Sequence, residues 1–509
     1  MNLCDNKYAP KGRFRCNEIK YKKEIDMKKT KKIFAFLLTV IMVVSVLVSC
    51  AKKDDSGETE IATVSEETVD LWEALPKNDY NGVTFNILQP VEQSYEFATD
   101  LTGSLVNDAV YKRDLTIESA YNIDLNYIPE PGNWTNRSTY LSLIRGSIQA
   151  EDGAYDLVNG MTSIIMPLTM EGLFFDYSKL DGIDFTDPWW INGIYDDLQI
   201  ADKLYTITGS SMLSMYKTTY VMYANTTLIN QRQMDNPIQL VLDGKWTMEQ
   251  LLKMTLEQGQ DLNNNGKDAE DFYGFASSAI AMRGFQTAFD LDLIGKDASG
   301  KLIYLGPNDR YFTAVDEFKK LASSDKDCFI ADAKKDADPS EIISMFAADR
   351  TIFLNESIET AEKLAAKCDD YIIIPQPKYN EEQENYYVQT GTATGMFAIP
   401  KTAKTDMVVD ILNAHGCLSY LNVVPAYYEE ALKTKYVNVP ENMDVIDIIN
   451  QSMMLDITYA HNYTINKSQT LMFMQHTTGV KDAASHFAAF QSSMNGILEG
   501  VYNNYAALD

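Results

Sequence analysis

Three apolar stretches decide the fold: Val83-Thr84-Phe85-Asn86-Ile87-Leu88, Ile123-Asp124-Leu125-Asn126-Tyr127 and Tyr155-Asp156-Leu157-Val158-Asn159-Gly160. Each is short and rich in β-branched or aromatic residues, which is typical of β-strands. Apolar residues at helical spacing lie between the strands, in residues 106–121 and 140–148. Strands that alternate with helices in this way favour a parallel sheet. The sequence therefore predicts an α/β fold that starts near residue 83.

The rest of the chain continues the alternation. Further strands are predicted at residues 203–208, 219–224, 351–354, 371–375 and 395–400. Further helices are predicted at residues 248–258, 342–346, 407–421 and 483–507. The first of these helices carries a capping box, because Thr247 stands three residues before Gln250.

Composition excludes several classes of protein. Of the 509 residues, 45% are hydrophobic and 23% are charged, which argues against a disordered chain and against a protein with many membrane spans. With 44 Lys and Arg against 72 Asp and Glu, the formal net charge is -28. Such a surface repels phosphate backbones, so nucleic acid is not an expected partner.

The N-terminus has the pattern of an export signal. A Lys cluster directly follows Met27 and precedes the uncharged apolar residues 33–48, and Leu47-Val48-Ser49-Cys50 resembles the bacterial lipobox. We expect a lipoprotein signal at 27–49, a non-native upstream extension at 1–26, and lipidation of Cys50. Two or three acyl chains would hold the protein on the extracytoplasmic face of the membrane. A cleaved signal without lipid, or a single anchor helix, is the alternative.

Residues 50–79 follow this signal and predict a flexible tether, because most of the stretch is polar and lacks an apolar period. If translation starts at Met27 and Cys50 carries lipid, three cysteines remain in the folded body: Cys328, Cys368 and Cys417. An odd number without a Cys-x-x-Cys motif argues against a disulfide framework and favours buried thiols.

The order of these segments resembles that of one protein family. The segments that carry the likeness, beside the three opening strands, are Ala120–Leu125, Asp202-Lys203-Leu204-Tyr205, Val221–Asn225, Asp243-Gly244-Lys245-Trp246-Thr247 and Met396-Phe397-Ala398-Ile399-Pro400. The chain is similar to the extracellular solute-binding proteins of ABC importers, in the family (family 1) of maltose- and oligosaccharide-binding proteins. The resemblance implies a two-lobe, periplasmic-binding-protein-like fold, with hinge strands that cross between the lobes and a ligand cleft between them.

On this mapping the first lobe comprises residues 80–208 and 371–425, and the second comprises 209–370 and 426–509. The resemblance implies a monomer that delivers a small solute, expected to be a carbohydrate, to the subunits of an ABC permease. Peptides or other solutes are alternative ligands, and a surface sensor or adhesin of the same fold is an alternative role. Open α/β sheets bind ligands beyond the carboxyl ends of their strands.

Aromatic rings bind the apolar faces of sugars, so the five tryptophans are candidates for stacking. Trp189 and Trp190 form the pair that we expect to supply a stacking surface, with packing in a lobe core as the alternative. Trp246 precedes a helix and is expected to pack, whereas Trp134 lies in a loop that reaches either the cleft or solvent. Polar and other ligand candidates come from loops at strand ends: Gln89, Asn159, Met161, Tyr216, Tyr220, Asn355, Glu356 and Thr390.

Residues 261–267 match the first half of a calcium loop, with oxygen-bearing side chains at positions 1, 3 and 5 and Gly266 at position 6. The second half departs from the EF-hand pattern, because Phe272 stands where a ligating Glu belongs. The expected ligands of a structural Ca²⁺ are Asp261, Asn263, Asn265, the Lys267 carbonyl and Glu270, with Asp271 as an alternative. An ordinary Asn/Gly turn is the other interpretation.

Sequence motifs give no support to an enzyme. The chain has four histidines and lacks the His-Glu-x-x-His, Gly-x-Ser-x-Gly and phosphate-loop motifs. Pairs of carboxylates carry no weight among 72 acids. We expect no catalysis and no catalytic cofactor.

Lipidation of Cys50 is directly testable, because the Lys cluster and the lipobox precede it. Mass spectrometry of protein extracted from membranes should find an N-terminal peptide that begins at an acylated Cys50. Recovery of unmodified Cys50 inside a longer, intact chain would contradict this prediction.

Overall fold

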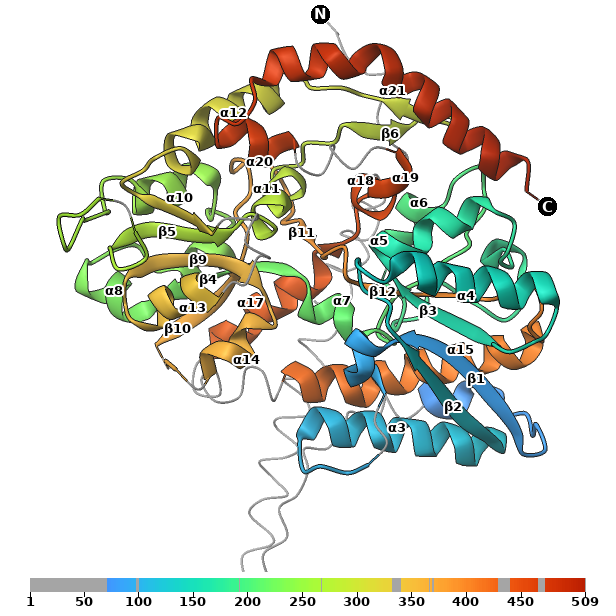
Figure 1. Cartoon of the computed structure of the whole chain (residues 1–509). Helices are drawn as coiled ribbons and strands as arrows, with labels where there is room; N and C mark the ends of the chain where they lie inside the picture. Colours follow the sequence, from blue (N-terminus) through green and yellow to red (C-terminus); the bar gives the residue numbers. More distant parts are fainter. Residues whose placement is uncertain are drawn as a thin grey trace, which may run out of the picture. The chain divides into compact units, whose positions relative to one another are not determined.

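The computed structural model describes residues 71–97, 100–191, 193–266, 268–331, 340–365, 367–368, 370–428, 440–465 and 472–508. The predicted signal, Cys50 and most of the predicted tether lie outside these ranges. The described residues from Trp72 onward belong to one compact unit. The following description concerns this unit (Figure 1).

The first sheet confirms the predicted parallel arrangement. Its strand order is β12-β3-β1-β2. The strands are β1 (Val83–Pro90), β2 (Ile123–Glu130), β3 (Leu157–Met161) and β12 (Gly395–Ala398). Strand β1 pairs in parallel with both β2 and β3, whereas β12 pairs antiparallel with β3. Helices α3 (Leu105–Tyr121) and α4 (Arg137–Ala150) are the connections between the parallel strands.

Local sequence sets the ends of α3. The Ser104 side chain accepts a hydrogen bond from the Asn107 amide at the N-terminus, and Asn122 ends the helix in the left-handed conformation at φ 49°. Val110, Ile117 and Tyr121 recur on one face of the helix and are fully buried. The chain then enters β2 directly at Ile123.

The second sheet has the order β10-β4-β9-β5-β8. Its strands are β4 (Tyr220–Asn225), β5 (Tyr273–Ser278), β8 (Cys328–Ala331), β9 (Thr351–Ser357) and β10 (Tyr371–Pro375). Strand β5 is parallel to β8 and β9, whereas β4 runs antiparallel to β9 and β10. Every residue of β4, β5 and β9 is buried, as in a sheet covered on both faces.

Two sequence assignments are corrected here. Residues 371–375 were expected in the first lobe but pair with β4 of the second sheet, and the chain returns to the first sheet only at β12. Residues 203–208 form isolated bridges rather than a strand, because only Lys203 and Ile207 pair with a neighbour. The capped helix α10 (Met248–Thr255) confirms the Thr247 cap but ends early, where Glu257 adopts a left-handed φ of 63°.

Helices cover both sheets and connect them. The remaining helices are η2 (Val91–Glu96), α5 (Thr162–Ile165), η3 (Met166–Met170), η4 (Tyr177–Lys179), α6 (Ile194–Leu198), α7 (Leu213–Lys217), α8 (Thr226–Gln231), α9 (Pro237–Leu242), η5 (Ala281–Arg283), α11 (Gly284–Ala288), α12 (Asp309–Ala322), α13 (Ser340–Ala347), α14 (Thr360–Ala365), α15 (Thr405–Leu418) and η6 (Ser419–Val423), with α17 to α21 described below. Among the described residues, one helical stretch, Thr405–Tyr428, has the length and apolar character of a membrane span, but 83% of its most apolar window is buried inside the protein.

The C-terminal segments contact both halves of the unit. They comprise α17 (Pro440–Gln451), β13 (Met453–Met454), α18 (Ile457–Ala460), α19 (Asn462–Ile465), α20 (Met472–Thr477) and α21 (Ala483–Ala506). Helix α17 packs on β10, and β13 pairs with β11 (Val388–Gln389). The long helix α21, red in Figure 1, contacts both η3 and the hairpin of β6 (Ile294–Lys296) and β7 (Leu302–Tyr304).

The predicted thiols lie inside the fold. Cys328 in β8 and Cys417 in α15 are buried, at 1% and 0% exposure, and Cys368 is half-buried. Burial raises the pKa of the Cys417 thiol to about 12, with a smaller contribution from the charge of Asp187. The prediction of buried thiols is confirmed for Cys328 and Cys417.

Candidate functional site

The candidate site lies at the carboxyl ends of strands in both sheets. Gln89 is near the end of β1, Asn159 is in β3, and Asn355 and Glu356 end β9. All four were predicted from strand order, and all four are buried, with exposures between 0% and 5%. Burial of polar side chains costs free energy unless they are hydrogen-bonded, so such residues call for partners.

Several polar atoms at these strand ends and in the segments after β10 and β11 and in α18 are buried, and they have no hydrogen-bond partner among the described residues. They are Gln89 Oε1, Asn159 Oδ1, Glu356 Oε2, Gln376 Oε1, Thr390 Oγ1 and Tyr459 OH. A buried carbonyl, carboxylate or hydroxyl oxygen can bind the hydroxyl groups of a small polar molecule. This composition suits a ligand rich in hydroxyl groups.

A polar network fixes one side of the site. The Asn355 amide donates to Ser277 Oγ at 2.8 Å, and the Gln376 amide donates to Asn355 Oδ1 at 2.8 Å and to the Ala281 carbonyl at 3.2 Å. This network ties η5 to the ends of β5 and β9. A Cβ atom on Gly284 would lie 2.5 Å from Gln376 Oε1, so a larger residue there would displace the Gln376 side chain.

Arg283 follows this network and lies near three tyrosines. Burial raises the pKa of Tyr220, Tyr459 and Tyr463, and the positive charge of Arg283 opposes that rise at each of them. Tyr220 starts β4, whereas Tyr459 and Tyr463 belong to α18 and α19. The guanidinium group is therefore close to both β4 and the C-terminal helices.

An aromatic pair connects the first sheet with the C-terminal helix α19. The rings of Trp134, from the connection after β2, and Tyr463 have centroids 4.4 Å apart with an interplanar angle of 31°. The guanidinium of Arg137 lies 3.8 Å from the centroid of the Trp134 ring. Trp134 is 44% exposed, so part of its ring surface remains accessible. This pair offers apolar ring surface at the edge of the polar site.

Glu356 is the buried carboxyl group of the site. Its Oε1 accepts a hydrogen bond from the Ser357 amide at 3.0 Å. Burial raises the pKa of Glu356, and a hydrogen bond from Ser278 partly opposes this shift. Burial thus disfavours the charged form of this carboxyl group, and its unpartnered Oε2 could accept a hydrogen bond from a hydroxyl group.

The four remaining predicted ligand residues lie in different parts of the fold. Tyr220 is beside Arg283 in the site, and Thr390 is buried after β11. Met161 is half-buried at the end of β3. Tyr216 lies in α7, where its hydroxyl contacts Ser210 Oγ at 3.1 Å and its ring packs edge-on to Tyr428. A role for these residues in ligand binding stays a prediction.

Trp189 and Trp190 are both buried to 2% exposure. A Cβ atom on Gly416 of α15 would lie 2.5 Å from Trp189, and Trp190 packs edge-on to Phe185. This arrangement favours the packing alternative, and the expected stacking of sugar on this pair stays a prediction. Trp246 packs as expected, because its ring stacks on Phe353 and its Nε1 donates to the Pro375 carbonyl at 2.8 Å.

Sequence reasoning missed Arg283, Tyr459 and Tyr463. Arg283 lies five residues after the end of β5, so strand-end reasoning would have included it had β5 been recognised. The two tyrosines come from short helices near the C-terminus, where the sequence gives no strand signal. Only the fold brings them to the site.

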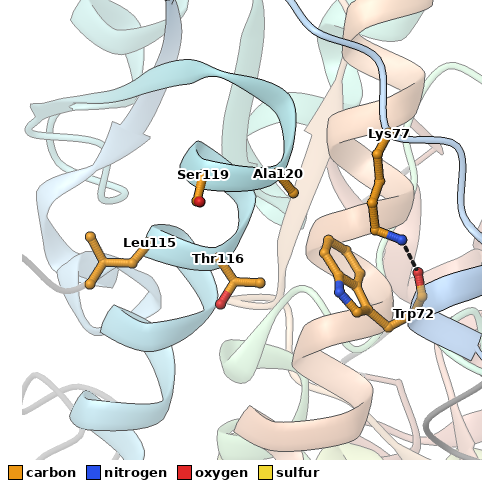
Figure 2. Close-up of a pocket in the computed structure, with 6 residues that line it drawn as sticks. All are labelled: Trp72, Lys77, Leu115, Thr116, Ser119 and Ala120. Atoms are coloured by element: carbon orange, nitrogen blue, oxygen red, sulfur yellow. Dashed lines mark hydrogen bonds between the residues drawn. The ribbon is translucent and has the colours of Figure 1, made fainter.

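A shallow pocket of about 330 Å³ lies elsewhere, between Trp72, Lys77 and residues of α3 (Figure 2). The Lys77 ammonium donates to the Trp72 carbonyl at 2.7 Å. Ser119 and Ala120 line the pocket just before β2 begins, so it lies at the amino ends of the strands. It holds none of the polar groups described above.

Comparisons with known proteins identify the fold. No family model matches the chain, and no curated protein matches its sequence. Among solved structures, the galacto-N-biose-/lacto-N-biose I-binding protein of an ABC transporter from Bifidobacterium longum, in complex with lacto-N-biose, matches with a TM-score of 0.53 at 12% identity, covering 85% of this chain and 100% of that one. The chain has the fold of an ABC-transporter solute-binding protein.

Two further structures with this solute-binding fold agree. An ABC transporter solute-binding protein from Thermotoga lettingae TMO, bound with alpha-D-tagatose, gives a TM-score of 0.50 at 15% identity over 82% of this chain and 100% of that one. A cyclo/maltodextrin-binding protein complexed with maltotetraose gives 0.52 at 10% identity over 82% and 97%. The predicted two-lobe α/β fold is confirmed.

The predicted calcium loop is compact. Asp261 accepts hydrogen bonds from the amides of Asn264, at 2.6 Å, and Gly266, at 3.1 Å. Asn263 Nδ2 lies 3.3 Å from Asp268 Oδ2 and 3.5 Å from Glu270 Oε2, so these three side chains converge.

Other parts of the loop fit the predicted ligand set less well. Asp271 is 2% exposed and accepts hydrogen bonds from the amides of Leu262 and Asp268, which ties it to the turn. Lys267 lies outside the described residues. In the described part of the chain, no group of three His, Cys, Asp or Glu side chains is placed to hold a metal. Calcium binding therefore stays a prediction that depends on Asp261, Asn263, Asn265 and Glu270.

Melting curves test the calcium prediction. Millimolar Ca²⁺ should raise the melting temperature relative to chelator, because few of the expected ligands are charged and the affinity should be modest. Asp261→Ala should abolish this difference. Asp297→Ala removes a comparable acid from another turn, and this control variant should keep the calcium-dependent rise in melting temperature. Identical wild-type curves in calcium and in chelator would make the loop an ordinary turn.

Proposed function

We propose that the protein is the solute-binding component of an ABC importer and that its ligand is a saccharide. The observation that carries this proposal is the Trp134–Tyr463 pair beside buried polar groups at the carboxyl ends of the strands. Ring faces suit the apolar surface of a sugar, and the polar atoms suit its hydroxyl groups. Three solved structures of the same fold belong to proteins with bound saccharides.

The arrangement suggests how binding would be coupled to transport. The site draws residues from β1 and β3 of the first sheet, from β4, η5 and β9 of the second part, and from α18 and α19. A ligand that contacts all of them stabilises the arrangement in which they are close together. A permease partner would then distinguish the loaded protein from the empty one. Lipid at Cys50 would keep the protein beside that permease.

Substitution of the exposed ring tests the site. In calorimetry against a saccharide found by a thermal-shift screen, Trp134→Ala should weaken binding by about 2- to 12-fold, which corresponds to the roughly 0.5–1.5 kcal/mol typical of aromatic stacking. Tyr463→Ala should have an effect in the same direction.

Trp72→Ala provides the matched control, because Trp72 lines the pocket on α3 and should leave the affinity unchanged. Equal affinities in the wild type and in both site variants would contradict contact between the saccharide and the Trp134–Tyr463 pair. A screen in which peptides bind and saccharides do not would reject the proposed ligand class.

A further inference from the structure

Arg283 lacks the partners that arginines in this chain usually have. Arg113 pairs with Asp114 at 2.8 Å, and Arg145 pairs with Glu171 at 2.6 Å. Arg310 donates to Gln383 at 2.7 Å. In contrast, Arg283 is half-buried, its Nε is fully buried, and no oxygen atom in the described part of the chain accepts a hydrogen bond from it. Such a guanidinium group keeps its capacity to bind an anion in a planar, two-bonded geometry.

The backbone that carries Arg283 is held firmly in the site. The Ala281 amide donates to Ser278 Oγ at 3.1 Å, and the Ala281 carbonyl accepts from Gln376. On the other side, a Cβ atom on Gly284 would lie 3.0 Å from the Tyr220 ring. Because hydrogen bonds restrain Ala281 and Gly284 packs closely against Tyr220, binding an anion at Arg283 would cost little ordering of the backbone.

Two acids in this part of the site accept backbone amides, although Glu356 Oε2 has no partner among the described residues. Glu356 accepts the Ser357 amide at 3.0 Å, and Asp456 accepts the Thr458 amide at 2.8 Å as the cap of α18. A second guanidinium, that of Arg137, lies 3.8 Å from the centroid of the Trp134 ring, which also contacts the Tyr463 ring. Two cationic groups therefore flank the aromatic pair, inside a protein whose formal net charge is -28.

We propose that the saccharide carries a carboxylate, as in a uronic acid, and that Arg283 binds this carboxylate while Trp134 and Tyr463 contact the sugar ring. This inference rests on the proposed function, since it names the chemical class of ligand for the same site. The acidic body of the protein repels anions in general, so an acidic sugar needs a local cation to bind at all. Arg283 provides that charge at the buried edge, where solvent screening is weak.

Pairs of acidic and neutral oligosaccharides test whether the ligand carries a carboxylate. The probes are galacturonate, glucuronate and mannuronate oligomers of two to four residues, each beside its carboxyl-reduced, neutral counterpart. Calorimetry should find that an acidic oligomer binds the full-length wild-type protein at least about tenfold more tightly than its neutral counterpart, as expected for a charged hydrogen-bonded pair. The preference should shrink as the salt concentration rises.

Variants assign the preference to one residue. Arg283→Gln should remove most of the preference for the acidic oligomer while leaving any neutral binding within about threefold, and Arg283→Lys should restore part of it. Arg145→Gln, which removes the exposed cation paired with Glu171, should change nothing.

The two proposals fail in different ways. Neutral oligomers that bind as well as the acidic ones, or an undiminished preference in Arg283→Gln, would overturn the role of Arg283 and leave the saccharide function standing. Binding of neither class, in a protein whose melting curve shows that it is folded, would overturn both.

Discussion

The parallel pairing of β1 with both β2 and β3 is the constraint on which the site depends. The registers Val83 with Ile123 and Ile87 with Leu157 bring the carboxyl ends of three strands to one edge. Parallel strands require long crossovers, so α3 and α4 occupy the faces of the sheet and the loops at this edge are left for binding. Gln89, Trp134 and Asn159 come from this edge or the loops beyond it.

The second sheet contributes rigidity and charge rather than ring surface. Hydrogen bonds among Ser277, Asn355 and Gln376 connect β5, β9 and the end of β10. Because Gln376 donates to both Asn355 and the Ala281 carbonyl, this network restrains the loop that carries Arg283. The C-terminal helices α18 and α19 then bring Tyr459 and Tyr463 to the same place. Residues far apart in sequence thus contribute the polar and aromatic groups of the candidate site.

The sequence predicted the first sheet well because strand and crossover alternate there without interruption. The ends of the predicted strands alone gave four of the candidate ligand residues: Gln89, Asn159, Asn355 and Glu356. Strand 371–375 was assigned to the wrong half because an apolar strand of five residues carries no information about its partner. Trp189 and Trp190 drew attention as a pair, although a buried ring and a binding ring look alike in sequence. Arg283 and Tyr463 depend on long-range packing, which local patterns do not encode.

The central claim is that the ligand binds at the carboxyl edges of the two sheets. Hydrogen exchange of backbone amides, measured with and without a saccharide from the screen, tests it most directly. We expect new protection in residues 89–96, 130–137, 278–286, 355–358 and 457–465, with little change in α3. Protection confined to residues 72–77 and α3, around the shallow pocket, would contradict it.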